Sequence, residues 1–266
     1  LCVGMAGSGA RVVPVPVLED NYSYILIDDE SGLAACVDPA EPEKVIQAAE
    51  SLGVALSLVL TTHKHWDHAG GNTQMAQLIP GIDIVGGEID EVEACTMKVS
   101  DDQELRLGET TITCLLTPGH TVGHISFFCQ ASACAHVFTG DVLFVGGCGK
   151  FFEGTAQEMY PSLYEKLGVL PVETQVWPGH EYTVSNYKFA LQVEPENEEL
   201  KDAAQWASDQ RSRNEFTVPS TIGKELQTNV FLRCSCAAVK AFCQVPEDAT
   251  VTDTLGMLRA RKDGKR

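Results

Sequence analysis

The chain has 266 residues, of which 44% are hydrophobic, and carries a formal net charge of −18 at pH 7. A chain of this length can bury one sizeable core, and it contains no run near the roughly 20 consecutive apolar residues that a membrane-spanning helix needs. The acidic charge argues against a nucleic-acid partner, because binding a polyanion requires a basic face that displaces counterions.

The first part of the chain alternates short apolar runs with turn signals, which predicts a meander of strands. These runs cover residues 11–17, 22–27 and 34–37. Apolar residues then recur at helical spacing over 42–52, with Pro42 at the start and Gly53 just past the end, so we predict a helix there. A continuous apolar strand over 56–60 ends where the chain turns polar at Thr61.

Strands and helices continue to alternate through the middle of the chain. The strands are predicted at 82–85, 110–116, 125–129, 136–139 and 175–177, and a helix at 156–167. This alternation indicates the α/β class. After Trp177 the pattern changes to polar amphipathic helices, which we predict over 184–193, 198–213 and 252–261. We therefore expect two domains, over 11–180 and 181–266.

Three imidazoles and one carboxylate lie within six residues directly after the strand at 56–60, at His63, His65, Asp67 and His68. These are ligands that zinc, iron and manganese accept. A solvated surface loop is the alternative, but burying so many polar groups without partners would cost about 1 to 3 kcal/mol for each. In a tight loop, side chains two residues apart point toward one ion, and the last two turn toward a neighbouring position. One loop thus supports two adjacent metal sites.

Three more ligand-type side chains follow predicted strand ends, each directly after a glycine. They are His120, Asp141 and His180. Glycine and the nearby prolines form tight turns that let a side chain reach inward. Each turn alone is weak support for a ligand, but together with the histidine-rich loop they supply seven ligands at the ends of successive strands.

This combination resembles the metallo-β-lactamase superfamily, in which a His-x-His-x-Asp-His loop and later His, Asp and His ligands bind two metals at one edge of an αββα sandwich. The resemblance implies one metal on His63, His65 and His120, another on Asp67, His68 and His180, and Asp141 as a bridge between them. It also implies that Asp67 and Asp141 act in catalysis with a metal-bridging hydroxide, because bound metal lowers the pKa of water to about 7. The identity of the two divalent ions stays open among zinc, iron and manganese.

Four further segments are similar to the glyoxalase II family, the hydroxyacylglutathione hydrolases. They are residues 18–22, 147–155, 218–221 and 229–233. The likeness runs in order from about Val12 to Arg233 and includes the helical C-terminal domain with which that family contacts glutathione. It implies a thioesterase that hydrolyses S-D-lactoylglutathione to D-lactate and glutathione in methylglyoxal detoxification.

The resemblance also assigns substrate contacts. Lys150 and Tyr182 fall where family members contact glutathione, and a cation and a phenol suit its carboxylates. Phe152 keeps an aromatic wall where many members have tyrosine, so one hydroxyl is missing. Within the ligand loop, we expect Lys64 to face outward and Trp66 to pack behind the loop.

The C-terminal helix departs further from the family, which uses an arginine and a nearby lysine there. Arg261 fits the arginine, whereas Lys265 or Lys262 fits the lysine only with a shift in spacing. The alternative for this basic segment is compensation of the helix dipole. On the family pattern, we expect Arg261 and Lys265 to contact glutathione.

Two other functions stay open. A glutathione persulfide dioxygenase shares the ligand loop but uses one iron and oxygen, and a non-catalytic relative would bind metal or glutathione conjugates without turnover. We expect a monomer that acts on a small-molecule glutathione thioester and binds neither nucleic acid nor membrane. The scattered cysteines favour reduced thiols in the cytoplasm, or in a mitochondrion or plastid if a targeting segment precedes Leu1.

Overall fold

The computed structural model describes residues 9–132 and 134–264. They form two compact units, each described by itself. The first unit comprises the chain up to Leu116 together with Gly123–Phe138, and the second comprises Thr117–Val122 together with the chain from Thr139. The expected division into domains at residue 180 stays a prediction.

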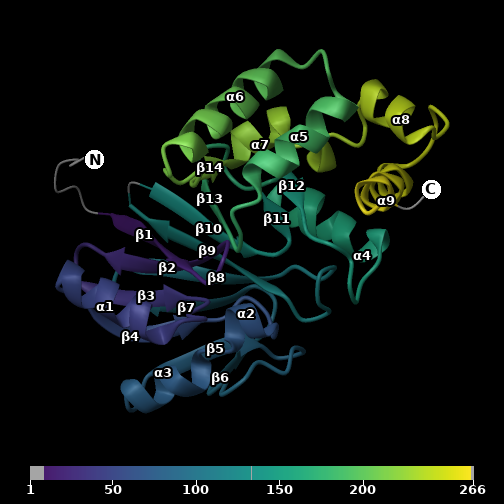
Figure 1. The fold of residues 1–266 in the computed structure, drawn as a ribbon. Helices are drawn as coiled ribbons and strands as arrows, with labels where there is room; N and C mark the ends of the chain where they lie inside the picture. Colours follow the sequence, from purple (N-terminus) through teal and green to yellow (C-terminus); the bar gives the residue numbers. More distant parts are fainter. Residues whose placement is uncertain (1–8, 133, 265–266) are drawn as a thin grey trace. The chain divides into compact units, whose positions relative to one another are not determined.

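The first unit contains a six-stranded mixed sheet in the order β1-β2-β3-β4-β5-β6 (Figure 1). The strands are β1 (Ala10–Val17), β2 (Asn21–Asp28), β3 (Leu33–Val37), β4 (Ala55–Leu60), β5 (Asp83–Gly87) and β6 (Met97–Val99). β1, β2 and β3 pair antiparallel, and the pairs from β3 to β6 are parallel. Because the carboxyl ends of parallel strands share one edge, the segments after β3 and β4 begin side by side.

Helices α1 (Pro42–Leu52) and α3 (Asn72–Leu78) supply apolar residues to the core of this sheet. Val45, Ala49 and Met75 lie in one buried cluster with residues of β1 to β4, which explains the helical spacing seen in the sequence. α1 ends as predicted, because Gly53 adopts a left-handed conformation with φ of 70°.

The first unit also contains an antiparallel meander in which β10, β9, β8 and β7 are neighbours. Its strands are β7 (Gln103–Leu107), β8 (Thr110–Leu116), β9 (Ile125–Ala131) and β10 (Cys134–Gly140), the last of which runs on into the second unit. The two sheets meet where the ring of Tyr24 in β2 lies 5.5 Å from that of Phe138 in β10. The Asp28 carboxylate joins them again, because it accepts hydrogen bonds from the Thr110 amide and hydroxyl at 3.0 and 2.7 Å.

The second unit is mainly helical. Its elements are β11 (Leu143–Phe144), β12 (Gly147–Cys148), α4 (Ala156–Tyr160), η1 (Pro161–Leu167), β13 (Gln175–Pro178), α5 (Thr183–Val193), α6 (Glu198–Ser212), β14 (Ser220–Thr221), α7 (Ile222–Thr228), η2 (Val230–Leu232), α8 (Ala237–Cys243) and α9 (Val251–Lys262). The helix predicted over 156–167 changes to a π-helix at Pro161. Proline lacks the N–H that would continue the α-helical ladder, and the bonding register shifts from there.

The long apolar elements are found where the sequence predicts them. The sequence analysis does not predict the two-residue strands β11, β12 and β14, the strands β6 and β7, or the helices α2 (Trp66–Ala69), α3, α7 and α8. Within the described ranges no helix is both long and apolar enough to cross a membrane.

Candidate functional site

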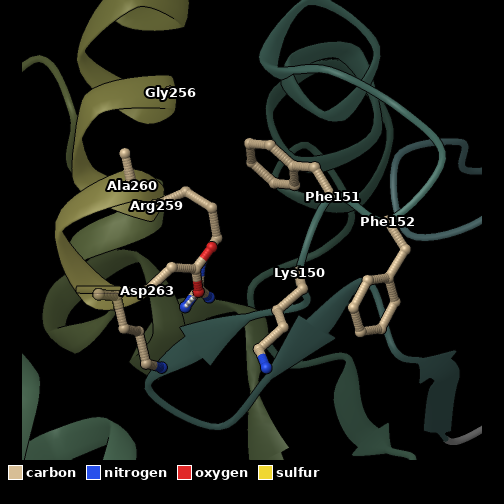
Figure 2. Close-up of a pocket in the computed structure, with 8 residues that line it drawn as sticks. Lys150, Phe151, Phe152, Gly256, Arg259, Ala260 and Asp263 are labelled. Carbon is tan, nitrogen blue, oxygen red and sulfur yellow. Dashed lines mark hydrogen bonds and ion pairs between the residues drawn. The ribbon is translucent and has the colours of Figure 1, made fainter. Parts of the chain in front are cut away.

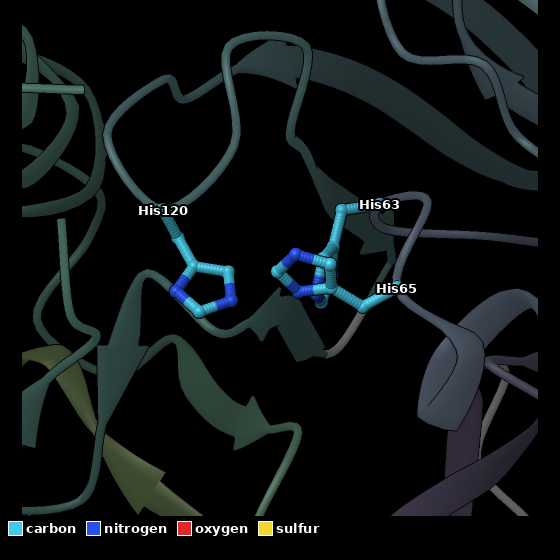
Figure 3. A group of neighbouring side chains, drawn as sticks. All are labelled: His63, His65 and His120. Carbon is cyan, nitrogen blue, oxygen red and sulfur yellow. The ribbon is translucent and has the colours of Figure 1, made fainter. Parts of the chain in front are cut away.

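The histidine-rich loop of the first unit follows β4 and leads into α2. Nε2 of His63 lies 3.0 Å from Nδ1 of His65 (Figure 3), and the rings of His63 and His68 lie 4.2 Å apart. The Asp67 carboxylate adds an oxygen 3.7 Å from Nε2 of His68. Both His63 and His68 are buried. The loop therefore gathers the four ligand-type side chains that the sequence placed there.

Asp38, which the sequence analysis did not select, orients this loop. It follows β3 and is buried. One carboxylate oxygen accepts from the Thr62 hydroxyl at 2.7 Å and lies 2.9 Å from Nδ1 of His68, while the other accepts from the Thr62 amide at 2.8 Å. A carboxylate on one ring nitrogen fixes the orientation of the imidazole and leaves Nε2 for a metal. An acidic residue at a strand end beside the ligand strand is the signal that could have revealed it.

Other neighbours of the loop hold its outer side. Nδ2 of Asn21 donates to the Asp67 carboxylate at 3.1 Å, and the buried His124 stacks on His63 with ring centroids 5.1 Å apart. The expectation for Trp66 is wrong, because its side chain is 73% exposed. It is the first residue of α2, and this helix buries its other side through His68 and Ala69.

The second unit brings together the three remaining ligand-type side chains. One Asp141 oxygen, Oδ2, lies 3.4 Å from Nε2 of His120 and 3.4 Å from Nε2 of His180. Asp141 directly follows β10, where Gly140 adopts a φ of 43°. Gly149 approaches so closely that a Cβ there would lie 1.8 Å from the Asp141 carbonyl oxygen, so only glycine is accommodated at this position.

The donor set fits a metal centre. Two ligands of a tetrahedral ion, each about 2.0 to 2.1 Å from it, lie about 3.3 Å from each other. The separations of 3.4 Å around Asp141 match this spacing. Nδ1 of His120 lies 2.9 Å from the Lys150 carbonyl oxygen, an outer contact of the kind that orients metal-binding imidazoles. Imidazole and carboxylate suit zinc, iron and manganese.

A cavity of about 290 Å³ in the second unit adjoins these side chains. It is lined by His120, Asp141, Phe144, Cys148, Gly149, Lys150, Phe152, Tyr182, Ser185, Asn186, Arg259 and Lys262. A second cavity, of about 720 Å³, shares Lys150, Phe152, Arg259 and Lys262 with the first (Figure 2). The candidate metal ligands and the basic side chains therefore line connected surfaces.

Three of the predicted substrate residues line the smaller cavity. The Tyr182 ring stacks on that of His180 at 4.7 Å, with an angle of 6° between the planes. Phe152 is 64% exposed, and its ring centroid lies 5.1 Å from that of His120. The Lys150 ammonium lies 5.8 Å from the centre of the Phe152 ring, and the two side chains extend next to each other in Figure 2.

The C-terminal helix presents different cations from those expected. Arg261 does not line either cavity; it donates to the Cys243 carbonyl at 3.1 Å and lies over the Phe242 ring. Lys265 lies outside the described residues. Arg259 and Lys262 line both cavities instead. Arg259 follows the buried Leu255 by four residues, and Lys262 follows the buried Leu258 by four. This helical spacing is the sequence pattern that could have identified the two cations.

Lys262 lies in an unusual environment for a lysine. Burial, together with the neighbouring Arg259 charge, lowers its pKa to about 8. Arg259 itself is buried, pairs with Asp263 at 2.7 Å and donates to the Cys148 carbonyl at 3.0 Å. The guanidinium is therefore held in place, and the Lys262 ammonium loses its proton at a lower pH than an exposed lysine does.

Comparison with known proteins agrees with this arrangement. Residues 19–180 match the metallo-beta-lactamase superfamily, and residues 181–264 match the hydroxyacylglutathione hydrolase C-terminus. The chain is 48% identical to the cytoplasmic hydroxyacylglutathione hydrolase of Arabidopsis thaliana, over 95% of this chain and 98% of that protein. It is 43% identical to a hydroxyacylglutathione hydrolase-like protein of Mus musculus, over 94% of this chain and 89% of that protein.

Among solved structures, the crystal structure of ETHE1 from Myxococcus xanthus has the same fold, with a TM-score of 0.67 and 22% identity. The match covers 96% of this chain and 91% of that one. The predicted fold class is thus confirmed. The chain belongs to the hydroxyacylglutathione hydrolase family, as a metal-dependent hydrolase with a metallo-β-lactamase fold and a helical C-terminal domain.

Proposed function

We propose that the protein hydrolyses S-D-lactoylglutathione to D-lactate and glutathione, using two divalent metal ions. One observation carries the proposal: Asp141, with two imidazole nitrogens each 3.4 Å from one of its oxygens, lines the same cavity as Lys150, Arg259 and Lys262. A metal-type donor set beside three cations suits a substrate that joins a reactive carbonyl to an anionic carrier. Family membership supports the same class of reaction.

The proposed ligands divide into two sets that share one bridge. The first set is His63, His65 and His120, the second is Asp67, His68 and His180, and Asp141 belongs to both. When bound, the ions polarise the thioester carbonyl and lower the pKa of water, so that a nucleophile forms at neutral pH. Zinc, iron and manganese all suit these donors.

The basic side chains would hold the glutathione part of the substrate. Glutathione carries two carboxylates, and charge-assisted hydrogen bonds to lysine and arginine are strong. Local cations can attract an anion although the chain as a whole has a charge of −18. Arg259 is already fixed by Asp263 and the Cys148 carbonyl, whereas Lys150 is exposed to solvent. The Phe144 and Tyr182 rings, 5.3 Å apart, form an aromatic wall of the cavity.

Hydrolysis of S-D-lactoylglutathione by the purified protein tests the proposal, with metal content measured on the same sample. We expect turnover that disappears on chelation and returns when zinc, iron or manganese is added back. A protein with two bound metals and no thioester hydrolysis would contradict the proposal. Oxygen uptake with glutathione persulfide in place of hydrolysis would instead identify the dioxygenase.

We also propose that the protein acts as a monomer in the cytoplasm and binds no nucleic acid. The cytoplasmic Arabidopsis relative supports the location, and the acidic charge supports the lack of nucleic-acid binding. Size-exclusion chromatography with light scattering, fractionation of cells and a nucleic-acid binding assay test these three points separately.

A further inference from the structure

A short hairpin, β11–β12, connects Asp141 to Lys150, and buried side chains from later in the chain bond to its backbone. The Phe144 and Gly147 carbonyls accept hydrogen bonds from Asn229 at 3.2 and 2.9 Å. The Val145 carbonyl accepts from Asn186 at 3.0 Å, and the Cys148 carbonyl accepts from Arg259 at 3.0 Å. The Gly146 amide donates to Glu225 at 2.8 Å. The hairpin between Asp141 and Lys150 is therefore hydrogen-bonded to buried side chains at each residue from Phe144 to Cys148.

Asn186 differs from the other partners because it also contacts a cavity cation. It lies on α5, is 2% exposed and lines the smaller cavity. Its Nδ2 donates to the Val145 carbonyl, and its Oδ1 accepts from the Lys262 ammonium. Since the amide nitrogen is the donor, the bond to Val145 fixes which end of the side chain faces Lys262.

The hairpin backbone at Gly147 also lies close to the Asn186 amide. A Cβ at Gly147 would lie 2.6 Å from Cγ, 2.7 Å from Nδ2 and 2.8 Å from Oδ1 of Asn186. The Asn186 amide thus fills the space that a side chain at position 147 would need. The hydrogen bond to Val145 and this close packing both support the orientation of the acceptor.

Among the residues that the structure describes, few other groups balance the charge of Lys262. The Phe189 and Phe231 rings lie 5.7 and 5.5 Å from its ammonium. Of the charged and titratable groups that act on it, Arg259 opposes its charge, whereas Asp263 and the Cys148 thiol favour it. Asp263 is paired with Arg259, and within residues 9–132 and 134–264 the Asn186 oxygen is the hydrogen-bond acceptor of the ammonium.

We propose that Asn186 is a positioning residue that holds the Lys262 ammonium charged and directed at a carboxylate of the glutathione thioester. The inference rests on the proposed function, because it specifies how the second unit recognises that substrate. A residue that merely supported the hairpin would leave the protonation of Lys262 unchanged.

Binding of S-methylglutathione tests this without turnover, because this thioether keeps both carboxylates and cannot be hydrolysed as a thioester. Affinity is measured by calorimetry across the pH range around the Lys262 pKa. In the wild type we expect affinity to fall as pH rises through that pKa, since the neutral amine no longer attracts a carboxylate. A Lys262→Met variant should lose this part of the pH profile.

Two variants of Asn186 should move the midpoint in opposite directions. Asn186→Asp places a carboxylate beside the ammonium and moves the midpoint to higher pH. Asn186→Leu removes the acceptor, moves the midpoint to lower pH and weakens binding at neutral pH by about tenfold. Asn214→Asp is the control for added charge, because Asn214 is exposed and aspartate tolerates its φ of 56°.

Thermal melting identifies which variants fold, and one folded Asn186 variant is sufficient because the direction of its own shift is predicted. Opposite shifts, absent from Asn214→Asp, support the role of Asn186. Midpoints that stay at the wild-type value overturn that role alone. A wild type that does not bind S-methylglutathione overturns the proposed glutathione site as well.

Discussion

Replacing Lys262 with methionine should stabilise the folded protein at neutral pH. The pKa of Lys262 is lowered from 10.5 to about 8, with burial as the main cause and Arg259 as the second. At about 1.4 kcal/mol per pKa unit, keeping this lysine protonated in the folded state costs at most about 3 kcal/mol. Methionine has a similar length without the charge but loses the hydrogen bond to Asn186, worth about 1 kcal/mol. We therefore expect a gain of about 1 to 2 kcal/mol at pH 7.

The stability difference between the wild type and Lys262→Met should depend on pH. Below a pH of about 8 both the folded and the unfolded wild type carry the proton on Lys262, so the cost is fully present. Between about 8 and 10.5 the folded protein has released the proton and the unfolded chain still binds it, so wild-type stability rises with pH. The advantage of Lys262→Met should shrink across this window and disappear above it.

Urea denaturation of both proteins, at equal metal content, measures the difference in unfolding free energy at pH 7 and above the window. Equal or lower stability of the variant at pH 7 would refute the reasoning. A difference of the same size at both pH values would also refute it, because the effect would then come from packing and not from charge.

Three further variants test separate parts of the structure. Asp141→Asn removes the shared carboxylate charge, and we expect reduced metal content and a loss of turnover of at least about a hundredfold. Asp248→Asn, at an exposed position, serves as the control. An active Asp141 variant with full metal content would contradict the assignment of Asp141 as a metal ligand. Gly147→Ala places a Cβ against Asn186 and should lower the unfolding free energy by about 1 to 3 kcal/mol, whereas an unchanged melting temperature would show that the hairpin moves freely. Trp66→Ala should change stability by less than about 0.5 kcal/mol because the side chain is 73% exposed, and a larger loss in chemical denaturation would place it in a packed contact.

Long periodic elements could be predicted from the sequence because burial imposes a pattern on them. β2 is buried along its whole length and is rich in aromatic and aliphatic residues, and α1 shows helical spacing between a proline and a glycine. β11 and β12 have two residues each, too few to show any period. The change of register at Pro161 depends on backbone hydrogen bonds that a propensity argument does not resolve.

Candidate site residues could be predicted where the signal was local. His63 to His68 lie in one six-residue segment, so their proximity needs no knowledge of the fold. Asp38 was missed because its contact with His68 depends on the parallel pairing of β3 with β4. On α9, the family pattern favours Arg261, whereas four-residue spacing from the buried Leu255 favours Arg259.

The side-chain bonds to the β11–β12 hairpin bear on how the chain can be divided. The family matches meet between residues 180 and 181, yet Asn186, Glu225, Asn229 and Arg259 all lie after that point. A fragment that ended at residue 180 would expose hairpin groups that are bonded to buried side chains in the full chain, and would free the segment that carries Asp141 and Lys150. In hydrogen exchange, we therefore expect the hairpin amides and the C-terminal helices to open together, as one cooperative unit across the boundary between the two family matches.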